Sequence, residues 1–314
     1  MTYKLNRRSF LKKGATLGAV SLIWSRFSPG LLYGKKSSEK VDISVVKGEN
    51  YFDNTIKAIE QLGGMKKFVP ENSKVAILPN VQRNNPGVYT KPDIVRAVIK
   101  MCKEAGAKEI NCLSWLPLEN WKNTGQARVL EEEGANLVLV DRQDESNFEP
   151  VPVPEGKSLS ESRIMKEFFK NDVFINIPIT KDHAGNKFTG TLKNMMGLNS
   201  PKNNRTFHKE NWTTDINSLK HLDQCIADLN TVIKPDLCIV DATEFIITNG
   251  PFGPGELIIP QKVVAGTDRV GIDAYCCTLW DLVPDDIIMI KQAHEHGIGE
   301  MDMNKLNIKE ISLT

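Results

Sequence analysis

The sequence predicts an α/β fold with a doubly wound, mainly parallel sheet and helices on both faces. Short, nearly continuous apolar runs rich in β-branched residues alternate with segments whose apolar residues recur at helical spacing. Such runs are typical of strands covered on both faces, and their alternation with helices is typical of parallel sheets. The expected strands are 43–46, 74–78, 109–113, 136–140, 173–177, 237–240 and 263–265.

Helical patterns fill the intervals between these strands. Pro92 stands in the first turn of the expected helix 92–105, and Gly106 and Gly134 each follow the end of a helical pattern. A stretch rich in proline and acidic residues, 147–157, marks a candidate division between two αβ halves, so one large domain over 37–314 or two smaller ones fit the sequence. The expected helices are 53–62, 92–105, 124–133, 215–232, 268–282 and 284–296.

The first 36 residues have the features of an export leader. The run Asn6-Arg7-Arg8-Ser9-Phe10-Leu11-Lys12 resembles the twin-arginine signal, and a short apolar stretch follows it. That stretch is too short to span a bilayer and fits a removable signal peptide. The sequence therefore predicts a periplasmic or otherwise extracytoplasmic protein that engages the twin-arginine translocase. An uncleaved leader acting as an anchor, or an amphipathic N-terminal helix of a cytoplasmic protein, would fit the same residues.

The net charge is +1 for the whole chain but negative for the part after the expected leader. Residues 1–36 hold eight of the 40 basic residues and none of the 39 acidic ones, which leaves 32 basic against 39 acidic residues. An acidic mature part argues against nucleic acid as a partner. No segment after the leader is apolar enough for a transmembrane helix.

Cysteine spacing gives no sign of a metal cluster. None of the six cysteines forms a Cys-x-x-Cys pair, so the sequence contains no iron–sulfur motif. Most of them stand in apolar patterns and are expected to be small buried side chains. The cofactor, if any, is unknown from the sequence.

Polar loops follow four of the expected strands, at residues 79–87, 178–194, 241–255 and 266–273. Ligands of open α/β sheets bind outside the carboxyl ends of the strands. If the four strands are parallel, these loops meet at one edge of the sheet. A binding site is therefore expected there.

In these four loops the chain resembles the family catalogued as domain of unknown function 362. The resemblance runs in order from about residue 75 to residue 299 and includes a Lys-x-His…Thr-Gly-x-x-Lys-Asn loop. It implies an α/β fold without a settled activity. Relatives that carry ferredoxin modules suggest electron transfer, but this chain lacks those modules. The matching residues are Pro79, Asn80, Asn176, Pro178, Lys181, His183, Thr189, Gly190, Lys193, Asn194, Gly197, Asp241, Gly250, Pro251, Gly253, Thr267, Asp268, Val270, Asp273 and Ala274.

Three residues of the loop after strand 173–177 are the candidate catalytic groups: Lys181, His183 and Lys193. Two lysines and an imidazole suit a small anionic ligand, because lysine pairs with carboxylate or phosphate and histidine moves protons or binds metal. A solvated, flexible polar loop would have the same composition.

The other site candidates are expected to bind the ligand or a divalent metal. Asp241 and Glu244 end a central strand and could supply oxygen ligands to a metal ion. Asp268 is first of all a helix N-cap, and Asp273 could equally be a charge on a helix face. The expected ligand-binding residues are Asn80, Thr189, Gly190, Asn194, Gly250, Asp268 and Asp273.

The sequence favours an exported enzyme or metalloprotein that binds a small anion. A non-catalytic solute-binding or chaperone-like module would use the same pocket. A nickel-cofactor enzyme is a further alternative, because the run from Pro178 through His183, Gly190 and Lys193 to Gly197 resembles a run of lactate-racemase-like proteins in residue types, although the spacing differs.

Replacing both arginines of the leader, Arg7→Lys with Arg8→Lys, should strand the precursor in the cytoplasm. Twin-arginine recognition needs the guanidinium pair, which lysine does not reproduce. Fractionation of cells expressing the two forms measures this effect. An unchanged yield outside the cytoplasm would reject the twin-arginine route.

Overall fold

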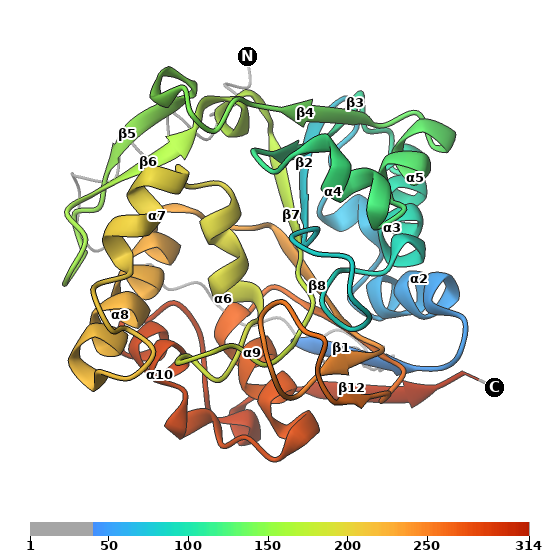
Figure 1. The fold of residues 1–314 in the computed structure, drawn as a ribbon. Coiled ribbons are helices and arrows are strands. Elements are labelled where there is room, and N and C mark those ends of the chain that lie inside the picture. The colour runs from blue at the N-terminus through green and yellow to red at the C-terminus, as the bar shows by residue number, and fades with distance from the viewer. Residues whose placement is uncertain (1–39, 314) are drawn as a thin grey trace, which may run out of the picture.

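The computed structural model describes residues 40–313, so the expected leader lies outside the described residues. Eight strands form one sheet in the order β12-β1-β11-β8-β7-β2-β3-β4 (Figure 1). The α/β fold with a mainly parallel sheet is thereby confirmed. The strands are β1 (Ile43–Lys47), β2 (Lys74–Pro79), β3 (Glu109–Ser114), β4 (Asn136–Leu139), β7 (Val173–Ile177), β8 (Leu237–Ala242), β11 (Lys262–Gly266) and β12 (Ile308–Ser312).

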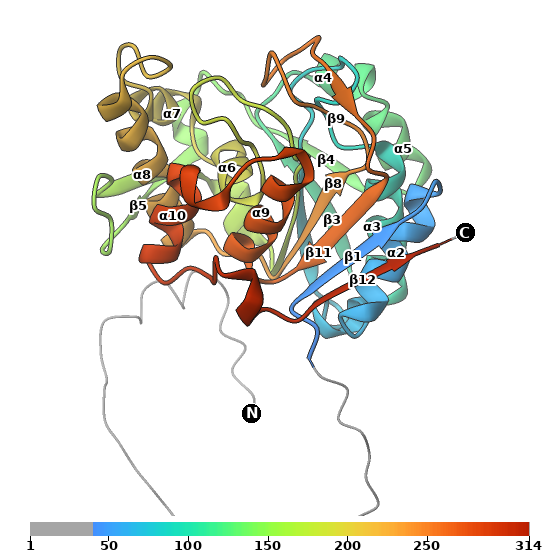
Figure 2. The same cartoon turned by 90° about the horizontal axis from the view of Figure 1, so that it is seen from below.

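Helices cover both faces of the sheet, as the two views show (Figures 1 and 2). One layer packs on the core that contains Ile59, Val98 and Trp121, and it consists of α2 (Tyr51–Gln61), α3 (Pro92–Glu104), α4 (Leu118–Asn123) and α5 (Gln126–Glu132). The other layer packs on the core that contains Leu192 and Ile226. It consists of α6 (Thr191–Asn194), α7 (Pro201–Phe207), α8 (Ile216–Val232), α9 (Arg269–Cys277) and α10 (Ile288–Glu295).

The central strands are buried along their whole length. All residues of β7 and β8 are buried, which explains their continuous apolar runs. The six cysteines are also buried and free, as expected of small core side chains. Within residues 40–313, no helix combines the length and apolarity that a membrane crossing requires.

Strand β11 runs against its neighbours, which corrects the expectation that segment 263–265 is parallel to the rest. It pairs antiparallel with both β1 and β8. The chain reaches β11 from β8 through a small hairpin of β9 (Phe245–Ile246) and β10 (Leu257–Ile258), without a crossover helix. Parallel neighbours need such a crossover, so a direct return produces the antiparallel pairing.

Two further pieces of sheet have no counterpart among the expected strands. Residues Phe148–Pro152 (β5) and Glu161–Met165 (β6) form an antiparallel hairpin where the proline- and acid-rich stretch begins. Strand β12 is a partly exposed edge strand, so its sequence lacks the apolar run that identified the inner strands.

The one-turn helix α6 is held at its start by a side chain from α9. The Asp273 carboxylate accepts hydrogen bonds from the backbone N–H groups of Thr191, at 2.6 Å, and Leu192, at 3.0 Å. Gly190 permits this approach, because a Cβ there would collide with the Asp273 carboxylate. These contacts fix the position of the two residues at the end of α6, Lys193 and Asn194.

Asp273→Ala should lower the free energy of unfolding by about 2–4 kcal/mol, since it leaves two buried N–H donors without an acceptor. Asp215→Ala is the matched control. It removes the N-cap of α8, where the side chain accepts from Ser218 N, and should cost only about 1 kcal/mol. Chemical denaturation of both variants measures the difference, and equal losses would contradict the anchoring role of Asp273.

Candidate functional site

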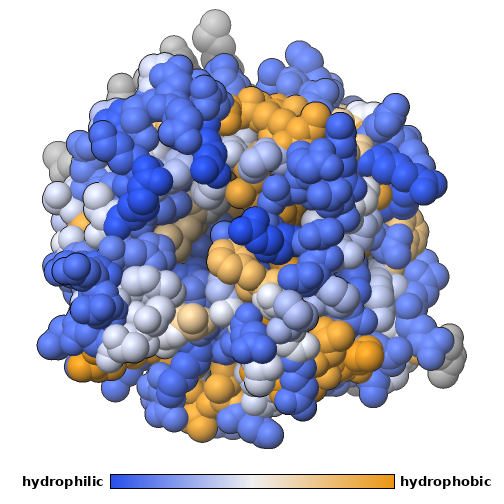
Figure 3. Space-filling view, in the orientation of Figure 1, coloured by the Kyte–Doolittle hydropathy of each residue, from blue (hydrophilic) through white to orange (hydrophobic). Residues whose placement is uncertain are grey.

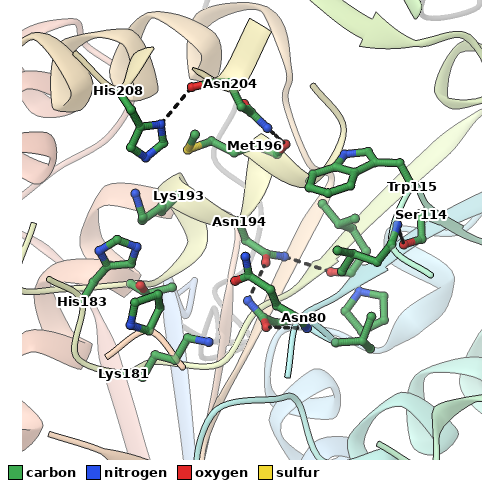
Figure 4. Close-up of a pocket in the computed structure, with 18 residues that line it drawn as sticks. Asn80, Ser114, Trp115, Lys181, His183, Lys193, Asn194, Met196, Asn204 and His208 are labelled. Atoms are coloured by element: carbon green, nitrogen blue, oxygen red, sulfur yellow. Dashed lines mark hydrogen bonds between the residues drawn. The ribbon is translucent and has the colours of Figure 1, made fainter. Parts of the chain in front are cut away.

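A pocket lies where β2, β3 and β7 end, and the segment through α6 and α7 closes its far side. Its volume is about 240 Å³. The side chains around it come from all of these elements (Figure 4). In the space-filling view, the centre of this face is hollowed and bordered by hydrophilic residues (Figure 3). Of the four loops expected to form a site, 79–87 and 178–194 supply much of the lining, 241–255 supplies Pro251, and 266–273 supplies none of it.

Lys181 is buried beside the pocket although it carries an amino group. Its side chain is 1% exposed, and Nζ donates a hydrogen bond to the backbone oxygen of Val88 at 2.7 Å. Backbone hydrogen bonds in both directions between Lys181 and Thr189 hold the two sides of the loop together. Burial, aided by the nearby Lys193, lowers the pKa of Lys181 to about 7.

His183 presents an imidazole of defined tautomer. Its Nδ1 lies 2.8 Å from the carbonyl oxygen of Ala184. Because a carbonyl only accepts, Nδ1 carries the hydrogen and Nε2 keeps a lone pair. Burial, with Lys193 and Lys181 adding repulsion, lowers the pKa of His183 well below its usual value. The imidazole is thus neutral at neutral pH.

Lys193 belongs to a buried chain of three polar side chains. Its Nζ donates to Asn186 Oδ1 at 3.1 Å, and Asn186 Nδ2 donates to Asp223 Oδ1. Burial lowers the pKa of Lys193 and raises that of Asp223, while the attraction between the two charges opposes both shifts. Asp223 on α8 is therefore the counter-charge behind Lys193.

A second imidazole completes the basic side of the pocket. His208 follows α7 and repeats the arrangement of His183, with Nδ1 at 2.8 Å from the backbone oxygen of Asn204. Burial lowers the pKa of His208. The Trp212 ring lies against both imidazoles, with centroid distances of 4.9 Å to His208 and 5.7 Å to His183.

Amide side chains form the middle of the pocket. Asn194 Nδ2 donates to Asn176 Oδ1 at 2.7 Å and to the Leu78 oxygen at 3.0 Å, and Asn80 Nδ2 lies 3.4 Å from Asn194 Oδ1. Asn80 and Asn194 thus occupy the positions between the basic residues and the opposite wall (Figure 4). Thr189 also lines the pocket, and its hydroxyl has no hydrogen-bond partner among residues 40–313.

The Gly-Pro turn rests on the loop that carries His183. Gly250 N donates to Asp182 Oδ2 at 2.7 Å, and Ala184 N donates to the Gly250 oxygen at 3.3 Å. A Cβ at Gly250 would collide with the backbone of Asp182, so only glycine fits this contact. Gly250 itself does not line the pocket, but its neighbour Pro251 does.

The two carboxylates expected to bind a metal are engaged by protein groups. Asp241 is fully buried and accepts from Lys91 N at 2.7 Å and from the Thr243 hydroxyl at 2.6 Å. Glu244 pairs with Lys91 Nζ at 3.0 Å. Neither lines the pocket, and residues 40–313 contain no group of three or more His, Cys, Asp or Glu side chains placed to hold a metal ion.

The residues after β11 also lie away from the pocket. Because β11 is antiparallel, Asp268 stands at the opposite edge of the sheet, where it caps α9 and accepts from Glu300 N at 2.8 Å. The expected convergence of Asp268 with the basic residues is therefore wrong. Asp241 does lie beside the basic loop, where its backbone oxygen accepts from Thr180 N at 3.0 Å, but it does not line the pocket. Asp273 and Gly190 contact each other beneath α6 instead of lining the pocket.

The pocket does bring together six of the expected residues, and it adds others that the motifs did not indicate. His208 and Trp115, which line the pocket, and Asp223, which lies behind Lys193, were not among the predicted site residues because each stands outside the four polar loops. Trp115 follows β3, whose succeeding residues are apolar and gave no polar signal. The expected residues that line the pocket are Asn80, Lys181, His183, Thr189, Lys193 and Asn194.

Comparison with known proteins identifies one family and several similar chains. Residues 75–278 match the family model described as "Domain of unknown function (DUF362)". A curated protein described as "Thylakoid-associated protein sll1697", from Synechocystis, is 29% identical over 185 residues. Those residues are 54% of this chain and 54% of that protein, so the chain spans about half the length of this relative.

Two solved structures are similar in part. The lactate racemase apoprotein from Thermoanaerobacterium thermosaccharolyticum matches with a TM-score of 0.49 and 15% identity, over 78% of this chain and 58% of that one. A protein from Thermotoga maritima matches with a TM-score of 0.40 and 16% identity, over 62% of this chain and 51% of that one.

Proposed function

The chain belongs to the DUF362 family, and on that premise we propose that it is an enzyme whose pocket binds a small organic anion. The observation that carries the proposal is the charge of the lining. Two buried lysines and two histidines line the pocket, and no carboxylate does. The Lys181 amino group has a backbone oxygen, not a carboxylate, as its hydrogen-bond acceptor, and a buried cation without a counter-charge is costly. An anion that enters would supply that counter-charge, and Lys193, which is balanced by Asp223, adds to the attraction.

We assign proton transfer to His183. Its Nδ1–H is bound to a carbonyl, which leaves Nε2 as an acceptor. Burial, and after it the charges of Lys193 and Lys181, lowers the pKa of His183, and a bound anion would offset the charge of the lysines and raise that pKa again. A base with a pKa near the working pH is the most effective in proton transfer.

The lysines are assigned as the anion's partners in preference to a metal ion. Both candidate metal carboxylates are bound to protein donors, and the pocket offers only two imidazole nitrogens as metal ligands of its own. A divalent metal would therefore need ligands from the substrate or solvent.

Export through the twin-arginine route is a separate proposal. It rests on the Arg7-Arg8 leader of this chain. The Synechocystis relative is described as thylakoid-associated, which is a statement about that protein. Transport in the folded state would deliver the pocket with any ligand acquired in the cytoplasm.

Anion affinity should fall as pH rises from about 6 to about 9. Lys181 has a pKa lowered to about 7, and that of Lys193 is also lowered, so both lose their protons within this window in the free protein. Above each pKa the affinity should drop by up to about tenfold per pH unit for each lysine that must be recharged. Calorimetric titration with sulfate measures this, because sulfate keeps its charge throughout. A flat profile would contradict binding by these lysines.

Lys193→Met and His183→Gln should separate binding from chemistry. Any small organic anion that mass spectrometry detects in the purified protein should be absent from Lys193→Met. His183→Gln should keep that anion but lose the exchange of its acidic hydrogens with deuterated water, followed by NMR. The thermal midpoint of His183→Gln should change by no more than a few degrees. Lys193→Met leaves the buried Asp223 without its counter-charge and should lower the midpoint by more, so binding is measured well below it.

Lys187→Met is the matched control, because Lys187 belongs to the same loop but is exposed and outside the pocket. It should leave both binding and exchange unchanged. Binding without any exchange in the unmodified protein would favour the alternative of a non-catalytic solute-binding module. An equal loss of binding in both lysine variants would reject the assigned site.

A further inference from the structure

The pocket has two chemically different walls. Lys181, His183, Lys193 and His208 lie on one side, and Trp115 lies on the opposite side with Asn80 and Asn194 between them (Figure 4). The chain around Trp115 contributes the apolar neighbour Leu116 to the same wall. An anion alone would use only the basic side and the amides.

Trp115 is held in place by the turn that ends β3. The Ser114 hydroxyl accepts a hydrogen bond from Leu116 N at 2.9 Å, and the Ser114 oxygen accepts from Val140 N at 2.9 Å. Trp115 is only half-buried, although its ring packs partly against the core. A large aromatic side chain that is fixed and yet open to a pocket is a ready apolar contact surface.

Met196 extends this apolar surface from the helical side. It stands in the short 3-10 helix Met195–Gly197 that follows α6, is half-buried and lines the pocket above Asn194 (Figure 4). Its thioether is flexible and packs well against flat rings. The same short segment thus supplies a cation, Lys193, and an apolar contact, Met196, to opposite parts of one ligand.

We infer that the ligand is an oxyanion that carries an apolar group of the size of an aromatic ring, with the oxyanion at the lysines and the apolar group at Trp115 and Met196. This inference rests on the proposed anion site and adds the class of the ligand. The pocket volume of about 240 Å³ is sufficient for a ring with a short acidic arm. A carboxylate or a phosphate could each pair with the lysines of the basic wall.

The test compares matched probes that differ only in the ring, using calorimetric titration of the intact protein. Phenylacetate should bind about tenfold more tightly than acetate, or phenyl phosphate about tenfold more tightly than inorganic phosphate, because ring burial against an aromatic wall is worth about this factor. The pair that shows the larger gap identifies carboxylate or phosphate as the head group. Ringed and ringless probes of equal affinity would overturn the inference.

Variants locate the contact. Trp115→Ala should remove most of the gap between ringed and ringless probes, and Trp115→Phe should restore it. Leu118→Ala is the control, because Leu118 is exposed near Trp115 but does not line the pocket. A gap that survives Trp115→Ala would overturn the inference while the anion site stands. Failure of all four probes to bind, or binding that Lys193→Met leaves intact, would instead reject the proposed function.

Discussion

The geometry of the site depends on the two hydrogen bonds by which the Asp273 carboxylate holds the start of α6. A helix of one turn has almost no stability of its own. Its four residues are all buried, and its last two are the cation Lys193 and the amide Asn194. An interaction far from the pocket mouth therefore decides where the cation lies. Gly190 is part of the same constraint, because no side chain fits between its backbone and the carboxylate.

The pKa values of the two pocket lysines depend on how charges are distributed around α6. Lys193 has its counter-charge behind it, in Asp223, through Asn186. Within residues 40–313, the Lys181 amino group donates its one hydrogen bond to the backbone oxygen of Val88. Burial, and after it the charge of Lys193, lowers the pKa of Lys181. An incoming anion would therefore both attract the lysines and offset the repulsion between them.

Much of the architecture could be predicted from the sequence, because buried central strands have continuous apolar runs. The strands from β1 to β4, together with β7 and β8, were located this way. Edge strand β12 and the hairpins were not, since half-exposed strands mix polar and apolar residues. The predicted direction of β11 was wrong, because a parallel β11 requires a crossover helix between β8 and β11. The absence of a helical pattern between 242 and 262 was the available signal for a direct return.

The reversal of β11 also explains which part of the site could be predicted. The loops after β2 and β7 end at the same edge, so Asn80, Lys181, His183, Lys193 and Asn194 meet as expected. The counter-charge could not be found by that rule, because Asp223 comes from the middle of α8, with no loop or motif to mark it. The apolar wall could not be predicted either, because Trp115 lies in an apolar segment and only polar loops were considered as sites. The sequence motif therefore identifies the basic wall of the pocket but not the apolar wall. Trp115 reaches the pocket because β3 ends beside β2 and β7, which the motif does not indicate.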